Sequence, residues 1–201
     1  MLVDTPRGPA RLTIDVAEEP GALLVLGHGA GGSILAADLV AVAAAGAAAG
    51  ITVVRVEQPY RVAGRRSPAP AAQLDEAWLS AVAAAREVCG PGLPLVVGGR
   101  SSGARVAART IAATGGIGLL ALAFPLVSLR GVSRGPELDG VGVPVLVLQG
   151  ERDPFGRPEA TELRRVHVLP GADHTLRGAA AEAAAAQAVA WLVELLAAQN
   201  A

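Results

Sequence analysis

Short apolar runs alternate with longer alanine-rich stretches along most of the chain. Apolar runs bounded by glycine or proline are typical of buried strands, whereas the longer stretches have the length and composition of helices. This alternation is the pattern of a mostly parallel sheet with helices on both faces, so the fold class is predicted to be α/β. Strands are expected at 23–27, 51–56, 95–98, 117–124, 143–149 and 165–169, and helices at 34–49, 71–89, 102–114 and 178–198.

An N-terminal hairpin and two loop segments are also predicted. Residues 2–5 and 11–17 have strand character and flank a turn-prone segment with two prolines, so they are expected to form a hairpin at one edge of the sheet. Residues 58–70 and 125–142 break the alternation and are expected to be loops, or loops that contain a short helix. No linker or repeat divides the sequence, so a single domain over residues 1–201 is predicted.

Composition narrows the class of partner. The 17 basic and 18 acidic residues give a net charge of -1 at pH 7, which favours a small-molecule substrate over nucleic acid or an anionic membrane surface. Cys89 is the only cysteine, which excludes an internal disulfide and a cysteine-based metal site and fits a reducing cytoplasm. We expect a cytoplasmic protein without metal or other cofactor, whose oligomeric state the sequence does not indicate.

The segment 99–103 reads Gly-Arg-Ser-Ser-Gly and fits the motif G-x-S-x-G between an expected strand and an expected helix. A sharp turn from strand to helix exposes the central serine, and small residues on both sides let neighbouring chain pass closely. Ser101 is therefore the candidate nucleophile, and the backbone N–H of Ser102 is a candidate oxyanion donor at the start of the helix. A phosphate-binding loop or a plain serine N-cap are the alternatives.

The segment 24–32 is an apolar strand followed by the glycine-rich turn Gly-His-Gly-Ala-Gly-Gly. In hydrolases with a G-x-S-x-G turn, such a loop supplies the second oxyanion N–H. Ala30 is the first candidate for this donor, with Gly29 and Gly31 as competitors, and His28 is interpreted as a residue that orders the loop. The glycines also permit a dinucleotide-binding turn with Glu57 as the ribose-binding acid, but that interpretation leaves Ser101 unexplained.

Two later segments supply a candidate acid and a candidate base. Asp153 follows the expected strand 143–149, at the edge of the sheet where ligand sites of parallel sheets collect, with Glu151 and Asp139 as alternatives. His174 follows the last expected strand. The order Ser101, Asp153, His174 is the one expected for a catalytic triad in this class of fold, in which the acid orients the histidine that takes the serine proton.

In these motifs the chain resembles the α/β-hydrolase superfamily, in particular its small cap-less members that are similar to dienelactone hydrolases. The resemblance implies hydrolysis of an acyl ester or thioester through a covalent intermediate. Dienelactone hydrolases carry a cysteine where this chain has Ser101, so their particular substrate is not implied. A catalytically silent scaffold with the same fold is the competing hypothesis.

Larger family members insert a lid where this chain has only the 18 residues 125–142, so the resemblance implies an open, shallow pocket. The arginine-containing loop 58–66 is expected to lie on the same edge of the sheet. Its arginines are compatible with an anionic substrate, although a solvated loop is the favoured interpretation.

Overall fold

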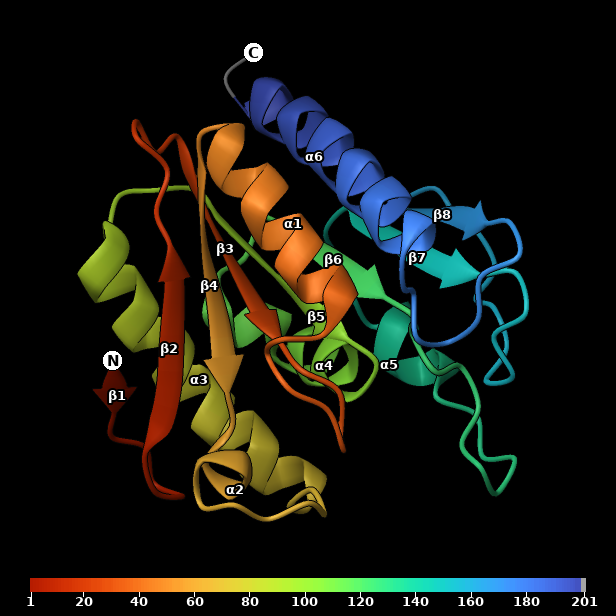
Figure 1. Cartoon of the computed structure of the whole chain (residues 1–201), viewed down its shortest axis with the longest axis horizontal. Helices are drawn as coiled ribbons and strands as arrows, with labels where there is room; N and C mark the ends of the chain where they lie inside the picture. The colour runs from red at the N-terminus through yellow and green to blue at the C-terminus, as the bar shows by residue number, and fades with distance from the viewer. Residues whose placement is uncertain (200–201) are drawn as a thin grey trace.

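The computed structural model describes residues 1–199 and contains one eight-stranded sheet with the strand order β1-β2-β4-β3-β5-β6-β7-β8 (Figure 1). All strand pairs from β4 to β8 are parallel, whereas β1 and β2 form an antiparallel hairpin at one edge. The strands are β1 (Leu2–Val3), β2 (Ala10–Asp15), β3 (Ala22–Gly27), β4 (Ile51–Glu57), β5 (Leu95–Arg100), β6 (Gly118–Leu122), β7 (Val145–Gly150) and β8 (Arg164–Leu169).

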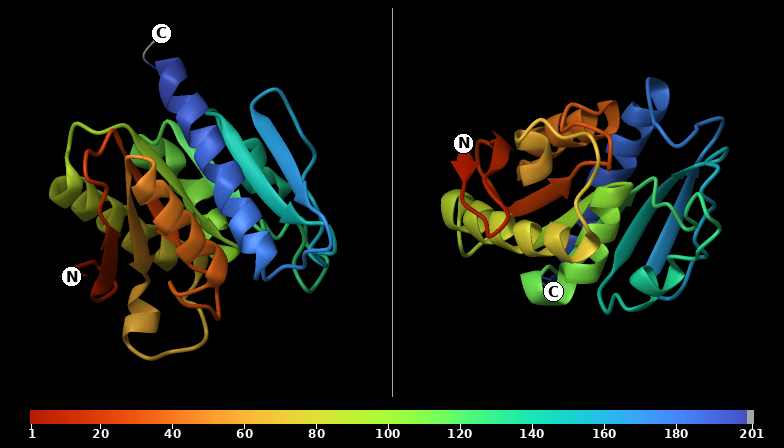
Figure 2. Two further views of the ribbon diagram at one scale, coloured as in Figure 1. Left: turned by 45° about the horizontal axis from the view of Figure 1, so that its top comes forward. Right: turned by 90° about the horizontal axis from the view of Figure 1, so that it is seen from below.

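Helices cover both faces of this sheet, as the two views of Figure 2 show. Residues of α1 and α6 pack in one apolar core, and residues of α3 and α4 pack in the other, on the opposite face. The short helices α2 and α5 lie in the two segments where the sequence pattern is interrupted. The helices are α1 (Ala37–Ala48), α2 (Pro59–Val62), α3 (Ala71–Cys89), α4 (Ser102–Thr114), α5 (Gly135–Asp139) and α6 (Ala179–Gln199).

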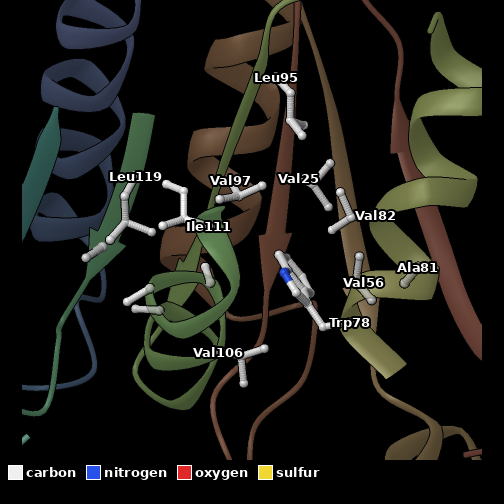
Figure 3. Packing of buried hydrophobic residues seen from close by; sticks show 14 of the residues in the cluster. Val25, Val56, Trp78, Ala81, Val82, Leu95, Val97, Val106, Ile111 and Leu119 are labelled. Atoms are coloured by element: carbon white, nitrogen blue, oxygen red, sulfur yellow. The ribbon is translucent and has the colours of Figure 1, made fainter. Parts of the chain in front are cut away.

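The central strands are buried on both faces, which explains why they are apolar runs without polar alternation. On β5, Val97 packs in the core under α3 and α4, whereas the adjacent Val96 packs in the core under α1 and α6. Trp78 of α3 and Ile111 of α4 lie over the first of these faces (Figure 3). The α/β fold class and the N-terminal hairpin predicted from the sequence are thus confirmed.

The last helix, α6, is long and apolar enough to span a membrane when length and composition alone are considered. Its Trp191, Leu192 and Leu195 are buried in the core that it shares with α1. Burial against a sheet explains an apolar face equally well, because a core helix passes the same test of length and composition.

The strand order creates a crevice beside β3. From β3 the chain enters α1 on one face of the sheet, whereas from the neighbouring β5 it enters α4 on the other face. The two connections therefore diverge at the carboxyl edge, which is where open parallel sheets bind ligands.

Gly98 of β5 leaves room for the neighbouring strand, because a Cβ at this position would lie 2.2 Å from the carbonyl oxygen of Leu120. We predict that Gly98→Ala lowers the free energy of unfolding by about 2 kcal/mol or more, since backbone of the sheet must shift. Gly92→Ala is the matched control, because a Cβ there meets no atom within 4 Å. Urea denaturation of both variants checks this, and equal stability would contradict it.

Candidate active site

Ser101, Asp153 and His174 follow three different strands and meet at the carboxyl edge of the sheet. Nε2 of His174 lies 3.0 Å from Oγ of Ser101, and Nδ1 lies 2.8 Å from Oδ2 of Asp153. Because Asp153 accepts the proton of Nδ1, Nε2 is left as an acceptor for the hydroxyl proton of Ser101. The structure therefore brings together the three residues that the sequence singles out.

Ser101 has a backbone conformation that non-glycine residues rarely adopt, with φ 52° and ψ -111°. Two glycines make this turn possible. A Cβ on Gly99 would lie 2.5 Å from the carbonyl oxygen of Gly27, and a Cβ on Gly103 would lie 2.3 Å from the same oxygen. The backbone N–H of Ser101 donates to the carbonyl of Leu122 at 2.9 Å, so the strained residue is also tied to β6. Strain of this kind persists where surrounding structure fixes it, and it is concentrated at functional sites.

The carboxylate of Asp153 is almost fully enclosed, with 1% of its side chain exposed. Its Oδ2 also accepts a hydrogen bond from Nε2 of Gln149 at 2.8 Å, and its Oδ1 accepts one from the backbone N–H of Phe155 at 2.9 Å. The Phe155 ring packs edge-on against the imidazole of His174 at a centroid distance of 4.7 Å. These contacts hold both members of the pair in one orientation. The role of Gln149 follows from tertiary packing and carries no sequence motif.

The two alternative acids lie elsewhere. Glu151 is exposed and accepts a hydrogen bond from the backbone N–H of Gly171, and Asp139 forms an ion pair with Arg164 at 2.8 Å. In the described chain, neither carboxylate hydrogen-bonds to His174. Of the three acids that the sequence offers, the structure places Asp153 against the histidine.

Ala30 and Ser102 both line the cleft beside Ser101. Ser102 begins α4, where the first backbone N–H groups of a helix have no partner within it and the helix dipole favours negative charge. The loop that contains Ala30 is fixed by a hydrogen bond of 2.5 Å from the hydroxyl of Tyr60 to the carbonyl of Ala30. The N–H of Ala30 donates to no backbone carbonyl within residues 1–199. Gly29 and Gly31 line the same cleft, so all three residues considered for the second donor border it.

His28 is buried behind the loop and is absent from the residues that line the cleft. Its Nδ1 donates to the carbonyl of Gly29 at 2.8 Å, and its Nε2 accepts from the backbone N–H of Gln58 at 3.1 Å. Burial lowers the pKa of His28, which keeps it in the neutral form that these two bonds require. This geometry agrees with a loop-ordering residue. It leaves little support for a dinucleotide site, since the proposed ribose-binding acid Glu57 forms an ion pair with Arg11.

Arg100, which precedes the candidate nucleophile, joins three parts of the site and was not singled out from the sequence. Its Nη2 donates to the carbonyl of His174 at 2.8 Å, and its Nε lies 3.0 Å from Oδ2 of the fully buried Asp38. The latter pair is an ion pair outside hydrogen-bond geometry. A Cβ on Gly29 would lie 2.9 Å from Nη1 of Arg100, so the guanidinium also packs against the glycine-rich loop. A single residue thus contacts the base loop, the glycine-rich loop and α1.

The cleft above Ser101 has a volume of about 760 Å³ and is open to solvent. One side is formed by residues of the segment 125–134 and another by residues of the segment 68–74. Arg61, Arg65 and Arg66 are not among the lining residues, so the arginines of the 58–66 loop lie away from this cleft.

Burial raises the pKa of Asp38 to about 6, against the opposing influence of Arg100. Because the folded-state pKa exceeds the ordinary value of 3.8, the folded protein binds the extra proton between about pH 4 and pH 6 and loses stability as pH rises through that interval. Asp38→Asn mimics the protonated form. We predict that its unfolding free energy, relative to the natural protein, rises by about 2 to 3 kcal/mol from pH 4 to pH 7.

Urea denaturation at a series of pH values measures this difference, and Asp4→Asn serves as the control because Asp4 is exposed. A difference between Asp38→Asn and the natural protein that does not change with pH would contradict the account of Asp38.

Comparison with known proteins agrees with this geometry. The sequence model of the family described as "Alpha/beta hydrolase domain" matches residues 20–197. The comparison with curated proteins found no match.

Solved structures with the same fold cover nearly the whole chain. XC6422 from Xanthomonas campestris, described as a serine hydrolase without lid, is 21% identical with a TM-score of 0.73, and the match covers 99% of this chain and 93% of that one. Est1E from Butyrivibrio proteoclasticus is 15% identical with a TM-score of 0.81, and the match covers 98% of each chain. Proline iminopeptidase from Mycobacterium smegmatis is 16% identical with a TM-score of 0.74, and the match covers 99% of this chain and 100% of that one.

At these identities the structural neighbours establish the fold, whereas the family model, which matches most of the chain, establishes descent. The chain belongs to the alpha/beta hydrolase domain family.

Proposed function

We propose that this hydrolase is a serine enzyme that cleaves a small ester or thioester through an acyl-enzyme on Ser101. The observation that carries the proposal is the continuous hydrogen-bonded chain from the Ser101 hydroxyl through His174 to the enclosed carboxylate of Asp153. Such a chain activates a hydroxyl as a nucleophile, because the histidine can accept its proton while the acid fixes the tautomer and stabilises the imidazolium.

In the proposed reaction, Oγ of Ser101 attacks the substrate carbonyl and its proton passes to Nε2 of His174. The carbonyl oxygen becomes an oxyanion, and in the proposed mechanism the backbone N–H groups of Ala30 and Ser102 stabilise it. His174 then returns the proton to the departing alcohol or thiol, and the acyl group stays on Ser101. A water molecule, deprotonated by His174, releases the acid and restores the hydroxyl.

A silent binding scaffold is the competing function. A scaffold needs no serine in a strained conformation, and it needs no enclosed carboxylate aimed at a histidine, because both features cost stability. Their coexistence beside an open cleft favours an enzyme that acts on a small molecule. A protein described as a proline iminopeptidase shares the fold, so the choice of an ester or thioester rests on the resemblance to dienelactone hydrolase-like proteins and on the open site.

Ser101→Ala is predicted to abolish labelling by a fluorophosphonate probe and to lower ester turnover on the order of a millionfold, because a triad acts as a unit. Ser102→Ala is the control, since its proposed contribution comes from the backbone N–H, which alanine retains. Gel fluorescence and a p-nitrophenyl acetate assay measure both effects. If labelling survived in Ser101→Ala and disappeared in Ser102→Ala, the nucleophile would be Ser102 and the proposal would be wrong.

Asp153→Asn is predicted to lower kcat by roughly ten-thousandfold, since an amide in place of the carboxylate favours the wrong tautomer of His174. Glu151→Gln and Asp139→Asn are controls of equal chemical change, and both should retain activity within a few-fold. Steady-state kinetics of the three variants on one ester shows which of the three carboxylates acts as the triad acid. Near-normal activity of Asp153→Asn beside an inactive control variant would transfer the acid role to that other residue.

A further inference from the structure

The cleft above Ser101 has an uneven charge. Six arginines line it, and no aspartate or glutamate is among its lining residues within the described chain. Three of the six are neutralised from outside the cleft: Arg100 pairs with Asp38, Arg105 with Glu137, and Arg109 with Asp75 and Glu137. The other three, Arg130, Arg134 and Arg177, have no carboxylate within 4 Å among residues 1–199.

Arg134 is the most constrained of these three. It is half-buried just before α5, and within residues 1–199 its guanidinium makes one hydrogen bond, a long one from Nη1 to the carbonyl of Pro125 at 3.4 Å. A guanidinium has five N–H donors, so most of the donors of Arg134 are left for solvent or a ligand. Arg130 and Arg177 are exposed, and the charge of Asp173 acts on Arg177, so these two contribute less specific attraction.

Glu137, the acid whose charge acts on Arg134, is already paired with other arginines. Both carboxylate oxygens of Glu137 are engaged by Arg105, at 2.7 and 2.6 Å, and one of them also accepts from Arg109 at 3.3 Å. Burial lowers the pKa of Arg134, and the charge of Arg105 acts in the same direction more strongly than Glu137 opposes it. The group of Arg105, Arg109 and Arg134 therefore has one cation in excess of its two acids, Glu137 and Asp75.

We propose that Arg134 anchors an anion subsite in this cleft, and that the substrate acted on at Ser101 carries an anionic oxygen group in addition to its ester or thioester. This inference rests on the proposed hydrolase function. A planar guanidinium binds carboxylate or phosphate oxygens through two parallel hydrogen bonds, which the unused donors of Arg134 permit. An anion at this position also relieves the repulsion within the arginine group. Arg130 and Arg177 attract the same charge to the mouth of the cleft.

Two pairs of matched esters test the anion on the leaving-group side and on the acyl side of the scissile bond. On the leaving-group side, 4-carboxyphenyl butyrate is compared with 4-carbamoylphenyl butyrate. On the acyl side, a monoaryl glutarate is compared with the corresponding glutaramate. Each pair replaces a carboxylate by an amide of nearly the same size, so the ratio of kcat/KM within a pair reports charge.

The natural protein is expected to prefer the carboxylate in at least one pair by roughly ten- to hundredfold, the range of a charge-assisted contact. Arg134→Gln should reduce that ratio to near one, and Arg134→Lys should keep part of it. Arg66→Gln is the control, because Arg66 is exposed and outside the cleft. The carboxylate-to-amide ratio of kcat/KM in Arg66→Gln should equal that of the natural protein. Urea midpoints of all variants show that the fold is retained.

A ratio near one for both pairs in the natural protein would overturn the inference, as would a preference that persists in Arg134→Gln. Ester turnover with no charge preference would remove the subsite and leave the proposed hydrolase function intact. Binding of the same compounds to Ser101→Ala, measured by calorimetry, tests the subsite independently of chemistry. A carboxylate preference there, combined with a natural protein that hydrolyses none of the esters, would keep the subsite and overturn the proposed function.

Discussion

The close approach of backbone between the end of β3 and the start of α4 is the constraint on which the site depends. The Gly27 carbonyl occupies the space that a Cβ on Gly99 or Gly103 would need. Because β3 and β5 are neighbours at the point where the strand order reverses, their following loops diverge to opposite faces of the sheet. Ser101 therefore lies at the bottom of the crevice, between the glycine-rich loop and the first turn of α4. The chemistry proposed for the protein follows from this packing of glycine against glycine.

Arg100 connects that constraint to the rest of the site. It belongs to the same turn as Ser101, and its guanidinium reaches both the carbonyl of His174 and the buried Asp38 of α1. Ionising Asp38 in this position costs stability, as the raised pKa near 6 indicates. Proteins commonly give up stability where a site must be held in one geometry. We interpret the Arg100–Asp38 pair as a positioning device for the loop with His174, in which buried charge is retained for its geometry.

The sequence was sufficient where the determining interactions are local. The helices α3 and α4 have the bounds expected from the sequence, and Ser101 lies in a motif that its strand-turn-helix context makes specific. For Asp153 and His174 the sequence offered only their place after expected strands, and it left Glu151 and Asp139 as alternative acids. Long-range contacts could not be read in this way. Arg100 gains its importance from His174, 74 positions away along the chain, and it occupies an unspecified position of the G-x-S-x-G motif. The bonds of Gln149 to Asp153 and of Arg134 to Pro125 span only 4 and 9 positions, but these contacts depend on loop conformations that no sequence motif marks. The 58–66 loop shows the converse, since its conspicuous arginines lie outside the cleft and its buried Tyr60 supports the glycine-rich loop.

The central claim is that an acyl group is carried on Ser101, and the most direct measurement locates that group. The natural protein, quenched in acid during turnover of a slowly released ester, is digested with trypsin, which cuts after Arg100 and Arg105 and isolates a five-residue peptide with both serines. Mass spectrometry of this peptide is expected to show the added acyl mass on Ser101, and none in Asp153→Asn treated for the same time. An acyl group on Ser102, or ester turnover with no acylated peptide at any time, would contradict the account.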